Sequence, residues 1–339
     1  MPPIRLAVIG SGHQAMTASV LIASYRRPRQ LAACLEALAR QQAAPEEIIV
    51  IWQGDDAATA RAAEPFTSQL GGRLILCHSP EVGVVPAENQ GLRRARGEVV
   101  LLIDDDAVPE PFWIERHLSH YQAPQVGAVG GPCRNRTLAG QAFPVRHQLP
   151  VSRLTWYGRV LGNTYDLPDA WRAWPPQPVQ HLVGNNMSFR RSAVAGFETH
   201  LRPYWQNFEL DACLQVQARG LQVIFDFANC VTHYPTNTAF SGGRSGDLEL
   251  KILNPAFNHA LILAKWSSGL QRAPRFLYAF LVGTGAAPGP LLLPLTLRRH
   301  GQFRREWRLA SQVWRSRWQG WRLGQSLRRA ARGSSGEPR

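Results

Sequence analysis

The chain has 339 residues, 45% of them apolar, which is enough to fill one large core or two modest ones. This excludes a short peptide-like binder and a chain that is disordered throughout. The formal charge of +14 is concentrated in residues 244–339, with 17 Lys or Arg against 4 Asp or Glu, which leaves 21 against 20 for residues 1–243.

Residues 1–17 contain an apolar run followed by Gly10-Ser11-Gly12, which imitates a dinucleotide-binding fingerprint. In such a fingerprint the glycines open a helix whose N-terminus holds pyrophosphate. Here the chain continues into β-branched residues that are typical of another strand, and no matching acid follows. We therefore interpret residues 1–17 as an N-terminal extension and predict no secretory signal in it.

From residue 18 the pattern alternates between strand and helix. The predicted strands are residues 18–26, 46–52, 73–79 and 98–106. The predicted helices are residues 29–42, 86–96 and 110–122. Apolar strands separated by helices indicate an α/β fold with a parallel sheet that is covered on both faces. Since ligands bind such sheets beyond the carboxyl ends of the strands, residues 24–27, 53–56 and 104–106 are expected at one edge.

Residues 134–180 show no clear period and predict a long loop or a small subregion. Regular patterns return afterwards. They predict strands over residues 181–191, 221–226 and 228–235 and a helix over residues 207–219. From about Arg244 the chain is predicted to be helical, aromatic and rich in arginine.

Three adjacent carboxylates, Asp104, Asp105 and Asp106, follow an apolar strand directly. They repel one another, at a cost that is hard to tolerate in an interior without a cation. Mg²⁺ and Mn²⁺ favour such oxygen ligands and are commonly shared with a substrate diphosphate. The alternative is that these are solvated acids in a turn before Pro109.

Two further acids, Glu209 and Asp211, lie at the start of a predicted helix with one apolar face. An acid at that place can serve as a general base, although acids are also favourable at any helix N-terminus. Neighbours two apart lie on different faces of a helix, so only one of the two is expected to work. His233 closes a predicted strand and can complete a metal site or be a satisfied structural residue.

Taken together, these segments resemble family 2 glycosyltransferases with the GT-A fold. The blocks that carry the resemblance are SVLIASYRRPRQLAACLEAL, EEIIVIWQGDD, GVVPAENQGLRRARGEVVLLIDDDAVPEP, VGNNMSFRRSAVAGF, FELDACLQVQARGLQVIF and VTHYP, in the order expected over residues 18–235. The resemblance implies a Rossmann-type mixed sheet flanked by helices. It also implies an inverting, metal-dependent transferase that uses a nucleotide-diphosphate sugar.

The resemblance assigns roles to individual residues. It makes Asp104 and Asp106 the outer members of a DxD motif that binds Mn²⁺ or Mg²⁺, with His233 as a further ligand. Glu209 falls where the family has its acidic base, with Asp211 as the alternative. The residues expected to hold the nucleotide sugar are Ala23, Ser24, Tyr25, Arg27, Gln53, Asp55, Asn89, Asp104 and Asp105. Asn186 and Trp205 are expected to contact the acceptor.

Three departures from the family pattern stand out. The strand-two aspartate that commonly meets the nucleotide base is replaced by Trp52-Gln53-Gly54, so the base need not be uridine. Glu88 stands where a basic residue usually precedes Asn89. The Glu-Asp pair of the family reads Phe208-Glu209 or Glu209-Leu210, depending on the register.

The C-terminal region carries two membrane-related signals. Residues 276–297 hold no charge and have bilayer-spanning length, but glycines and prolines would break a simple helix there. Further on, arginines alternate with tryptophans; these are Trp307, Trp314, Trp318 and Trp321. A helix in a lipid headgroup layer, nucleic-acid binding, and packing on the catalytic domain all fit this composition. We expect the lipid surface, because a lipid-linked acceptor requires proximity to the membrane, and we expect no nucleic-acid partner.

The sequence thus predicts an inverting glycosyltransferase that acts on a glycan or lipid-linked acceptor in polysaccharide or glycolipid synthesis. The expected domains are a GT-A domain over residues 18–243 and a C-terminal helical region over residues 244–339. Five cysteines without a CxxC pair argue against a disulfide framework and favour the cytoplasm, at the inner face of the membrane. A sugar nucleotidyltransferase and a catalytically degenerate nucleotide-binding protein are the alternatives.

Overall fold

The structure is a computed structural model that describes residues 16–142, 151–161, 164–203, 207–235, 252–284, 289–292 and 303–334. The described residues fall into two compact units. The first is drawn from the stretches Met1–Arg153, Leu161–Phe197 and Ala212–Thr238, and the second from Leu154–Val160, Glu198–Asp211 and Ala239–Arg339. The domain boundary expected at residues 243–244 lies outside the described residues and stays a prediction.

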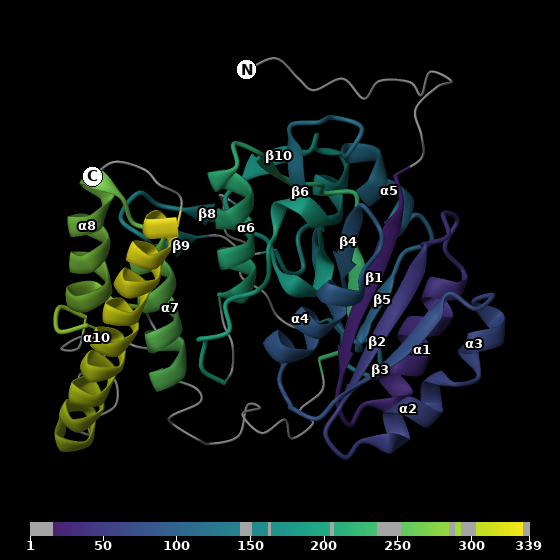
Figure 1. The fold of residues 1–339 in the computed structure, drawn as a ribbon, viewed down its shortest axis with the longest axis horizontal. Coiled ribbons are helices and arrows are strands. Elements are labelled where there is room, and N and C mark those ends of the chain that lie inside the picture. Colours follow the sequence, from purple (N-terminus) through teal and green to yellow (C-terminus); the bar gives the residue numbers. More distant parts are fainter. Residues whose placement is uncertain are drawn as a thin grey trace. The chain divides into compact units, whose positions relative to one another are not determined.

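An eight-stranded mixed sheet forms the centre of the first unit, with strand order β10-β12-β6-β11-β4-β1-β2-β3 (Figure 1). Its strands are β1 (Ala18–Ser24), β2 (Glu47–Gln53), β3 (Leu74–Ser79), β4 (Val99–Leu102), β6 (Val126–Gly130), β10 (Gln177–Val179), β11 (Met187–Arg190) and β12 (Gln222–Phe225). Strands β1 to β4 pair in parallel, whereas β11 runs antiparallel to both β4 and β6. The mixed α/β fold that the resemblance implies is therefore confirmed.

Helices cover both faces of this sheet. They are α1 (Pro28–Ala39), α2 (Ala57–Ala63), α3 (Phe66–Gln69), α4 (Val84–Arg94), α5 (Trp113–His120) and α6 (Phe208–Ala218). Leu31 and Leu35 of α1 share one core cluster with Val20 and Ile22 of β1. On the opposite face, a Cβ at Gly91 of α4 would lie 2.9 Å from the Ile51 side chain, so glycine permits the close approach of helix and sheet.

A small second sheet, of order β5-β13-β7, positions His233 relative to the three aspartates. Its strands are β5 (Ala107–Pro109), β7 (Cys133–Asn135) and β13 (Val231–His233). In the register of β13, His233 lies opposite Ala107 of β5 and opposite Asn135 of β7. Because Ala107 directly follows the three aspartates, this register carries His233 to the acidic turn.

Several sequence-based strand boundaries need correction. The strand expected over residues 98–106 ends at Leu102, so the aspartates lie in the turn between β4 and β5. The strand expected over residues 181–191 is confined to β11 and is preceded by a 3-10 turn, Gly184–Asn186. The parallel pairing expected for the strands of residues 18–106 is confirmed for β1 to β4, and the antiparallel pairs of β10 and β11 make the sheet mixed, as the resemblance implies. All five cysteines are described, and none forms a disulfide.

The second unit is helical, as expected for the C-terminal region. It contains α7 (Asn254–Lys265), α8 (Arg272–Leu277) with a π-helical turn after it (Tyr278–Val282), and α10 (Phe303–Ser334). A Cβ at Gly320 of α10 would lie 2.2 Å from the Phe257 carbonyl oxygen of α7, so the two helices pack with their backbones in close approach. Two short strands, β8 (Arg153–Leu154) and β9 (Val160–Leu161), pair with each other. Among the described residues, no helix combines the length and the apolar character needed to cross a membrane.

Candidate active site

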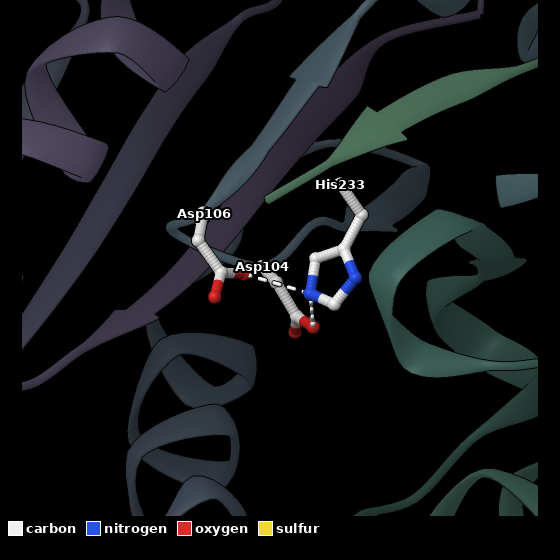
Figure 2. Close-up of side chains that lie close together, drawn as sticks. All are labelled: Asp104, Asp106 and His233. Atoms are coloured by element: carbon white, nitrogen blue, oxygen red, sulfur yellow. Dashed lines mark ion pairs between the residues drawn. The ribbon is translucent and has the colours of Figure 1, made fainter. Parts of the chain in front are cut away.

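Asp104, Asp106 and His233 converge at the turn between β4 and β5 (Figure 2). The His233 Nε2 atom lies 3.0 Å from Oδ1 of Asp106 and 3.8 Å from Oδ2 of Asp104. One ligand atom from each of the three side chains lies within 4.8 Å of the others. Two carboxylates and an imidazole at such distances are a suitable donor set for a divalent cation.

The hydrogen bonding of His233 also fits a metal ligand. Its Nδ1 lies 2.8 Å from Oδ1 of Asn135, and since that amide oxygen only accepts, Nδ1–H is the donor. This tautomer leaves the Nε2 lone pair directed at the two aspartates when the ring is neutral. Histidine ligands in proteins are commonly oriented by such a bond from the other ring nitrogen.

The electrostatics of the three groups show a conflict that a cation would relieve. Burial and the neighbouring Asp106 raise the pKa of Asp104 above its ordinary value. Burial alone would lower the pKa of His233, but the hydrogen bond and charge of Asp106 and the charge of Asp104 raise it. The cluster thus attracts positive charge.

The middle acid, Asp105, is held by a different set of groups. Its Oδ1 accepts from Arg27 Nη1 at 2.9 Å and its Oδ2 from Ser24 Oγ at 2.6 Å. Arg27 also donates to Oδ2 of Asp106 at 2.9 Å. Burial raises the pKa of Asp105 to about 7, although Arg27 and Ser24 act to lower it. Asp105 therefore ties the acidic turn to the end of β1, while Asp104 and Asp106 face His233.

The loops after β1 and β2 meet beside this turn, as expected. Gln53 is buried; its Nε2 donates to the Ser24 carbonyl at 3.3 Å and its Oε1 accepts from Gly83 N–H at 2.6 Å. Asp55 is 79% exposed and pairs with Arg26 at 3.3 Å. Tyr25 is partly buried, with the Arg26 guanidinium 5.0 Å from its ring centroid. Ala23 is a partly buried residue of β1.

Trp52 and His78 lie next to these loops, where β2 and β3 end in parallel. Their ring centroids are 4.0 Å apart with an interplanar angle of 30°. His78 Nε2 lies 2.8 Å from the Gly54 carbonyl oxygen. The run that replaces the usual strand-two aspartate is thus fixed by contacts to β3.

Two asparagines that are expected from the sequence to contact ligands instead form hydrogen bonds inside the protein. Asn89 bonds both N–H and C=O of Phe197. Asn186 is fully buried, with Oδ1 accepting from Trp113 Nε1 and Nδ2 donating to the carbonyls of Pro132 and Asn229. A contact of Asn186 with an acceptor would require its exposure and stays a prediction, and Trp205 lies outside the described residues.

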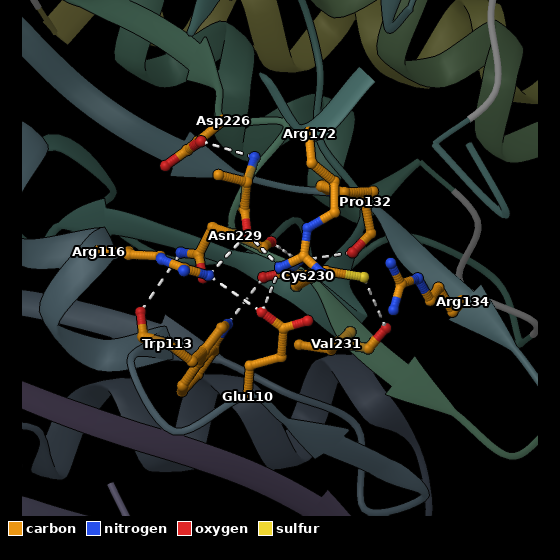
Figure 3. A network of polar contacts seen from close by, with 12 residues as sticks. Glu110, Trp113, Arg116, Pro132, Arg134, Arg172, Asp226, Asn229, Cys230 and Val231 are labelled. Atoms are coloured by element: carbon orange, nitrogen blue, oxygen red, sulfur yellow. Dashed lines mark hydrogen bonds and ion pairs between the residues drawn. The ribbon is translucent and has the colours of Figure 1, made fainter. Parts of the chain in front are cut away.

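A polar network supports the loop that leads into β13 (Figure 3). Arg116 and Arg172 both donate to the Ala228 carbonyl and both pair with Oε2 of Glu110, at 3.0 and 2.6 Å respectively. Asp226 holds the start of the same loop by accepting from Ala228 N–H at 2.9 Å. Because Glu110 follows β5 directly, the network fixes the entry to β13 relative to β5, and hence the position of His233.

In the second unit, Glu209 and Asp211 differ in their surroundings. Asp211 is fully buried, and its Oδ1 accepts from Lys265 Nζ at 2.9 Å and from Trp266 Nε1 at 2.7 Å. Lys265 also donates to Glu198 at 2.7 Å, and these carboxylates raise its pKa although burial acts to lower it. Glu209 is partly buried at the start of α6.

Sequence reasoning missed several residues that shape these sites. Asp56 caps α2 and also accepts from the backbone N–H of Arg26, which has a left-handed backbone. An acid before an alanine-rich helix is an N-cap signal that could have revealed it. Asn135 and Lys265 gave no local signal, because their partners come from distant strands and helices.

Comparisons with known proteins identify the family of the chain and support its fold. Residues 19–196 match the family model described as Glycosyl transferase family 2. Among curated proteins, the chain is 24% identical over 233 residues to the glucosyl-dolichyl phosphate glucuronosyltransferase of Haloferax volcanii, covering 64% of this chain and 69% of that protein.

Two solved structures are similar in fold. A mannosyltransferase from Pyrobaculum calidifontis in complex with GDP-Man and Mn²⁺ has a TM-score of 0.55 and 16% identity, covering 96% of this chain and 89% of that chain. GalNAc-T7 with UDP, GalNAc and Mn²⁺ has a TM-score of 0.58 and 14% identity over 75% of this chain. This chain spans about half of GalNAc-T7, at 49% of its length.

Proposed function

The chain belongs to glycosyl transferase family 2, and on that premise we propose that it transfers a sugar, with inversion, from a nucleotide-diphosphate sugar to a hydroxyl group of a glycan or lipid-linked acceptor. The observation that carries the proposal is the cluster of Asp104, Asp106 and His233. Two structural neighbours carry Mn²⁺ together with a nucleotide or nucleotide sugar, which supports the same use of this cluster. Family membership also argues for glycosyl transfer over nucleotidyl transfer.

Asp104, Asp106 and His233 are proposed to hold Mn²⁺ or Mg²⁺. When bound, the ion would supply positive charge against the diphosphate of the donor. Asn135 keeps the His233 ring in the tautomer that directs Nε2 toward the aspartates. Asp105, Arg27 and Ser24 hold the turn in place, so that the outer two carboxylates need not reorganise when the donor binds.

The nucleotide is proposed to lie against the loops after β1 and β2. Tyr25 and Asp55 are the members of the predicted set with accessible side chains there, and Arg27 lies between that loop and the acidic turn. Gln53 supports the loop from within, through its bonds to Ser24 and Gly83. In place of the aspartate that commonly meets the nucleotide base, strand β2 has Trp52, whose ring lies against His78. A base other than uracil is compatible with this pair.

Glu209 is proposed as the general base in preference to Asp211. The Asp211 carboxylate is buried in bonds to Lys265 and Trp266, and a base must reach the acceptor hydroxyl to take its proton. In the proposed step, the Glu209 carboxylate accepts the hydroxyl proton while the hydroxyl oxygen bonds to the anomeric carbon. The bond from that carbon to the diphosphate oxygen breaks, and the nucleoside diphosphate leaves with the electron pair. One such displacement inverts the anomeric centre.

The second unit is proposed to rest on the inner face of the cytoplasmic membrane. Trp314 and Trp318 of α10 are 46% and 40% exposed and stack in parallel at 6.0 Å, whereas Trp321 is buried against Phe276. Half-exposed indoles on an arginine-rich helix suit a headgroup layer of anionic lipids. The side chain of Trp307 lies outside the described part of the chain.

The experiment that tests the proposed function is a turnover screen. The purified chain is incubated with Mn²⁺ and a panel of nucleotide-diphosphate sugars, and released nucleoside diphosphate is measured together with the anomeric configuration of the product by NMR. We expect turnover of at least one donor and an inverted product. Stabilisation by a nucleotide without any turnover would support the degenerate binding protein, and a retained configuration would contradict the displacement.

A further inference from the structure

The second unit contains a cavity of about 810 Å³ whose lining comes from distant stretches of the chain. Tyr157 and Arg159 contribute from the segment before β9, His259 from α7, and Leu277 and Leu281 from α8 and the π-helical turn. The volume falls within the range of about 300–1,000 Å³ that is typical of small-ligand sites. All of these residues belong to the second unit.

Part of the cavity lining is apolar and unusually exposed. Leu277, Leu281 and Leu291 are 50%, 41% and 63% exposed, although large aliphatic side chains gathered in one place are normally covered. The backbone holds Leu291 next to Leu281, because Leu291 N–H donates to the Leu281 carbonyl at 2.9 Å and Gly289 N–H to the Val282 carbonyl at 2.7 Å. The chain thus holds a preformed leucine wall.

Another part of the lining is polar and cationic. The Arg159 guanidinium is exposed at the lining, and its charge acts on the phenol of Tyr278, which packs against the Tyr157 ring with centroids 5.4 Å apart. His259 is buried, its ring lies 3.2 Å from the Gly158 carbonyl oxygen, and burial lowers its pKa to about 4, so it is neutral near pH 7. None of the described residues that line the cavity is acidic. The only full charge on the lining is therefore positive.

Exposed leucines and a single cation in one lining match one class of ligand, an amphiphile with a single chain and an anionic head. We propose that this cavity binds the lipid phosphate of a lipid-linked acceptor, with the hydrocarbon next to the phosphate lying along Leu277, Leu281 and Leu291 and the phosphate at Arg159. The inference rests on the proposed function, since it names the class of acceptor. The curated relative whose name includes a dolichyl phosphate is consistent with this class.

The cavity and the exposed tryptophans of α10 would bind lipids in different ways. Trp314 and Trp318 do not line the cavity, and a headgroup layer would engage them through many lipids at once. The cavity would take one chain and one phosphate. A soluble lipid phosphate below its micelle concentration therefore probes the cavity alone.

The test measures equilibrium binding of radiolabelled geranylgeranyl phosphate to the full chain without vesicles or donor. The variants are Arg159→Glu and Leu281→Asp, with Leu291→Asp as a second wall variant, because all three side chains are exposed and folding can be checked by thermal melting. Matched controls are Arg322→Glu and Leu270→Asp, an exposed arginine and a leucine that is 95% exposed, neither of which lines this cavity.

We expect saturable binding that weakens about tenfold or more in each cavity variant and stays unchanged in the controls. Geranylgeraniol, which lacks the phosphate, should bind more weakly to the wild type and equally to wild type and Arg159→Glu. Equal binding by wild type and cavity variants, or equal losses in the controls, would overturn the proposal and point to non-specific lipid adsorption. Donor hydrolysis by the wild type tests the proposed function separately, so a failure of one is distinguishable from a failure of the other.

Discussion

The Nε2 atom of His233 lies 3.0 Å from Oδ1 of Asp106, although the two residues are far apart in the sequence. The pairing of β13 with β5 brings them together, since His233 is opposite Ala107, the residue after Asp106. A local change in that register would move the imidazole to the other face of the small sheet. The convergence of Asp104, Asp106 and His233 thus depends on strand pairing.

Asp106→Asn is expected to abolish tight Mn²⁺ binding while the fold is retained. The amide keeps the shape of the side chain but removes a negative charge from the donor set. Electron paramagnetic resonance titration of Mn²⁺ measures the effect, with Glu36→Gln on the exposed face of α1 as the control. Mn²⁺ affinity equal to the wild type would show that the ion binds elsewhere.

Asn135→Leu is expected to weaken Mn²⁺ binding about 10- to 100-fold through loss of the bond that orients His233. A carboxylate accepts the same Nδ1–H bond, so Asn135→Asp should restore most of the affinity. The readout is the increase in melting temperature as Mn²⁺ is added. If Asn135→Leu and Asn135→Asp lose affinity equally, the bond to His233 does not matter for the metal.

The sequence could predict most of the central sheet, because β1, β2 and β4 are continuous apolar runs with helical patterns between them. It could not predict the direction of β11, since a strand buried on both faces reads the same in either direction. The convergence of Asp104, Asp106 and His233 followed from the resemblance to a family. The role of Asn135 could not be predicted, because it depends on the register of β7 against β13.

Glu209→Gln is expected to lower the transfer rate about 10²- to 10⁴-fold with donor binding and stability unchanged. Asp211→Asn should act differently, because it removes the buried partner of Lys265 and lowers the stability of the second unit. Transfer kinetics and thermal melting of both variants separate these outcomes. Normal transfer by Glu209→Gln would assign the base to another residue.

The sequence could not decide between Glu209 and Asp211 as the general base, and the reason is physical. Both stand in the first turn of α6, and nothing local distinguishes them. Lys265 distinguishes them in the structure, and it comes from α7, 54 residues away. Long-range ion pairs of this kind leave no periodic pattern.

The stability of the protein is expected to fall in acid partly through Glu198. Burial would raise its pKa, but the bonds to Lys265 and His200 lower it below the ordinary value of 4.5. The unfolded chain therefore takes up a proton first, and the stabilisation present above about pH 4.5 is lost as the pH falls through the lower folded value.

Lys265→Met should remove this contribution and lower the free energy of unfolding by about 3–5 kcal/mol near neutral pH, because it leaves Glu198 and Asp211 buried without their cation. Urea unfolding from about pH 3 to pH 7 measures both effects. Lys265→Arg, which keeps the charge, is the matched control. An unchanged unfolding midpoint in Lys265→Met would contradict the role of this ion-pair network.

Vesicle flotation tests the surface of α10. The full chain is expected to float with anionic vesicles and to be released by high salt, because the arginines act through screened charges. Replacing Trp314 and Trp318 together by serine should reduce flotation without unfolding, since both rings are half-exposed. Equal flotation of this double variant and the wild type would exclude the two tryptophans from a membrane contact.

Asp104, Asp106 and His233 are proposed to serve metal-dependent sugar transfer. The most direct test of this role uses a sugar donor that the wild-type chain turns over. The release of nucleoside diphosphate is measured before chelation, after chelation and after Mn²⁺ is added back. We expect chelation to stop the release and added Mn²⁺ to restore it. Release that continues at the same rate in the chelated protein would contradict this role.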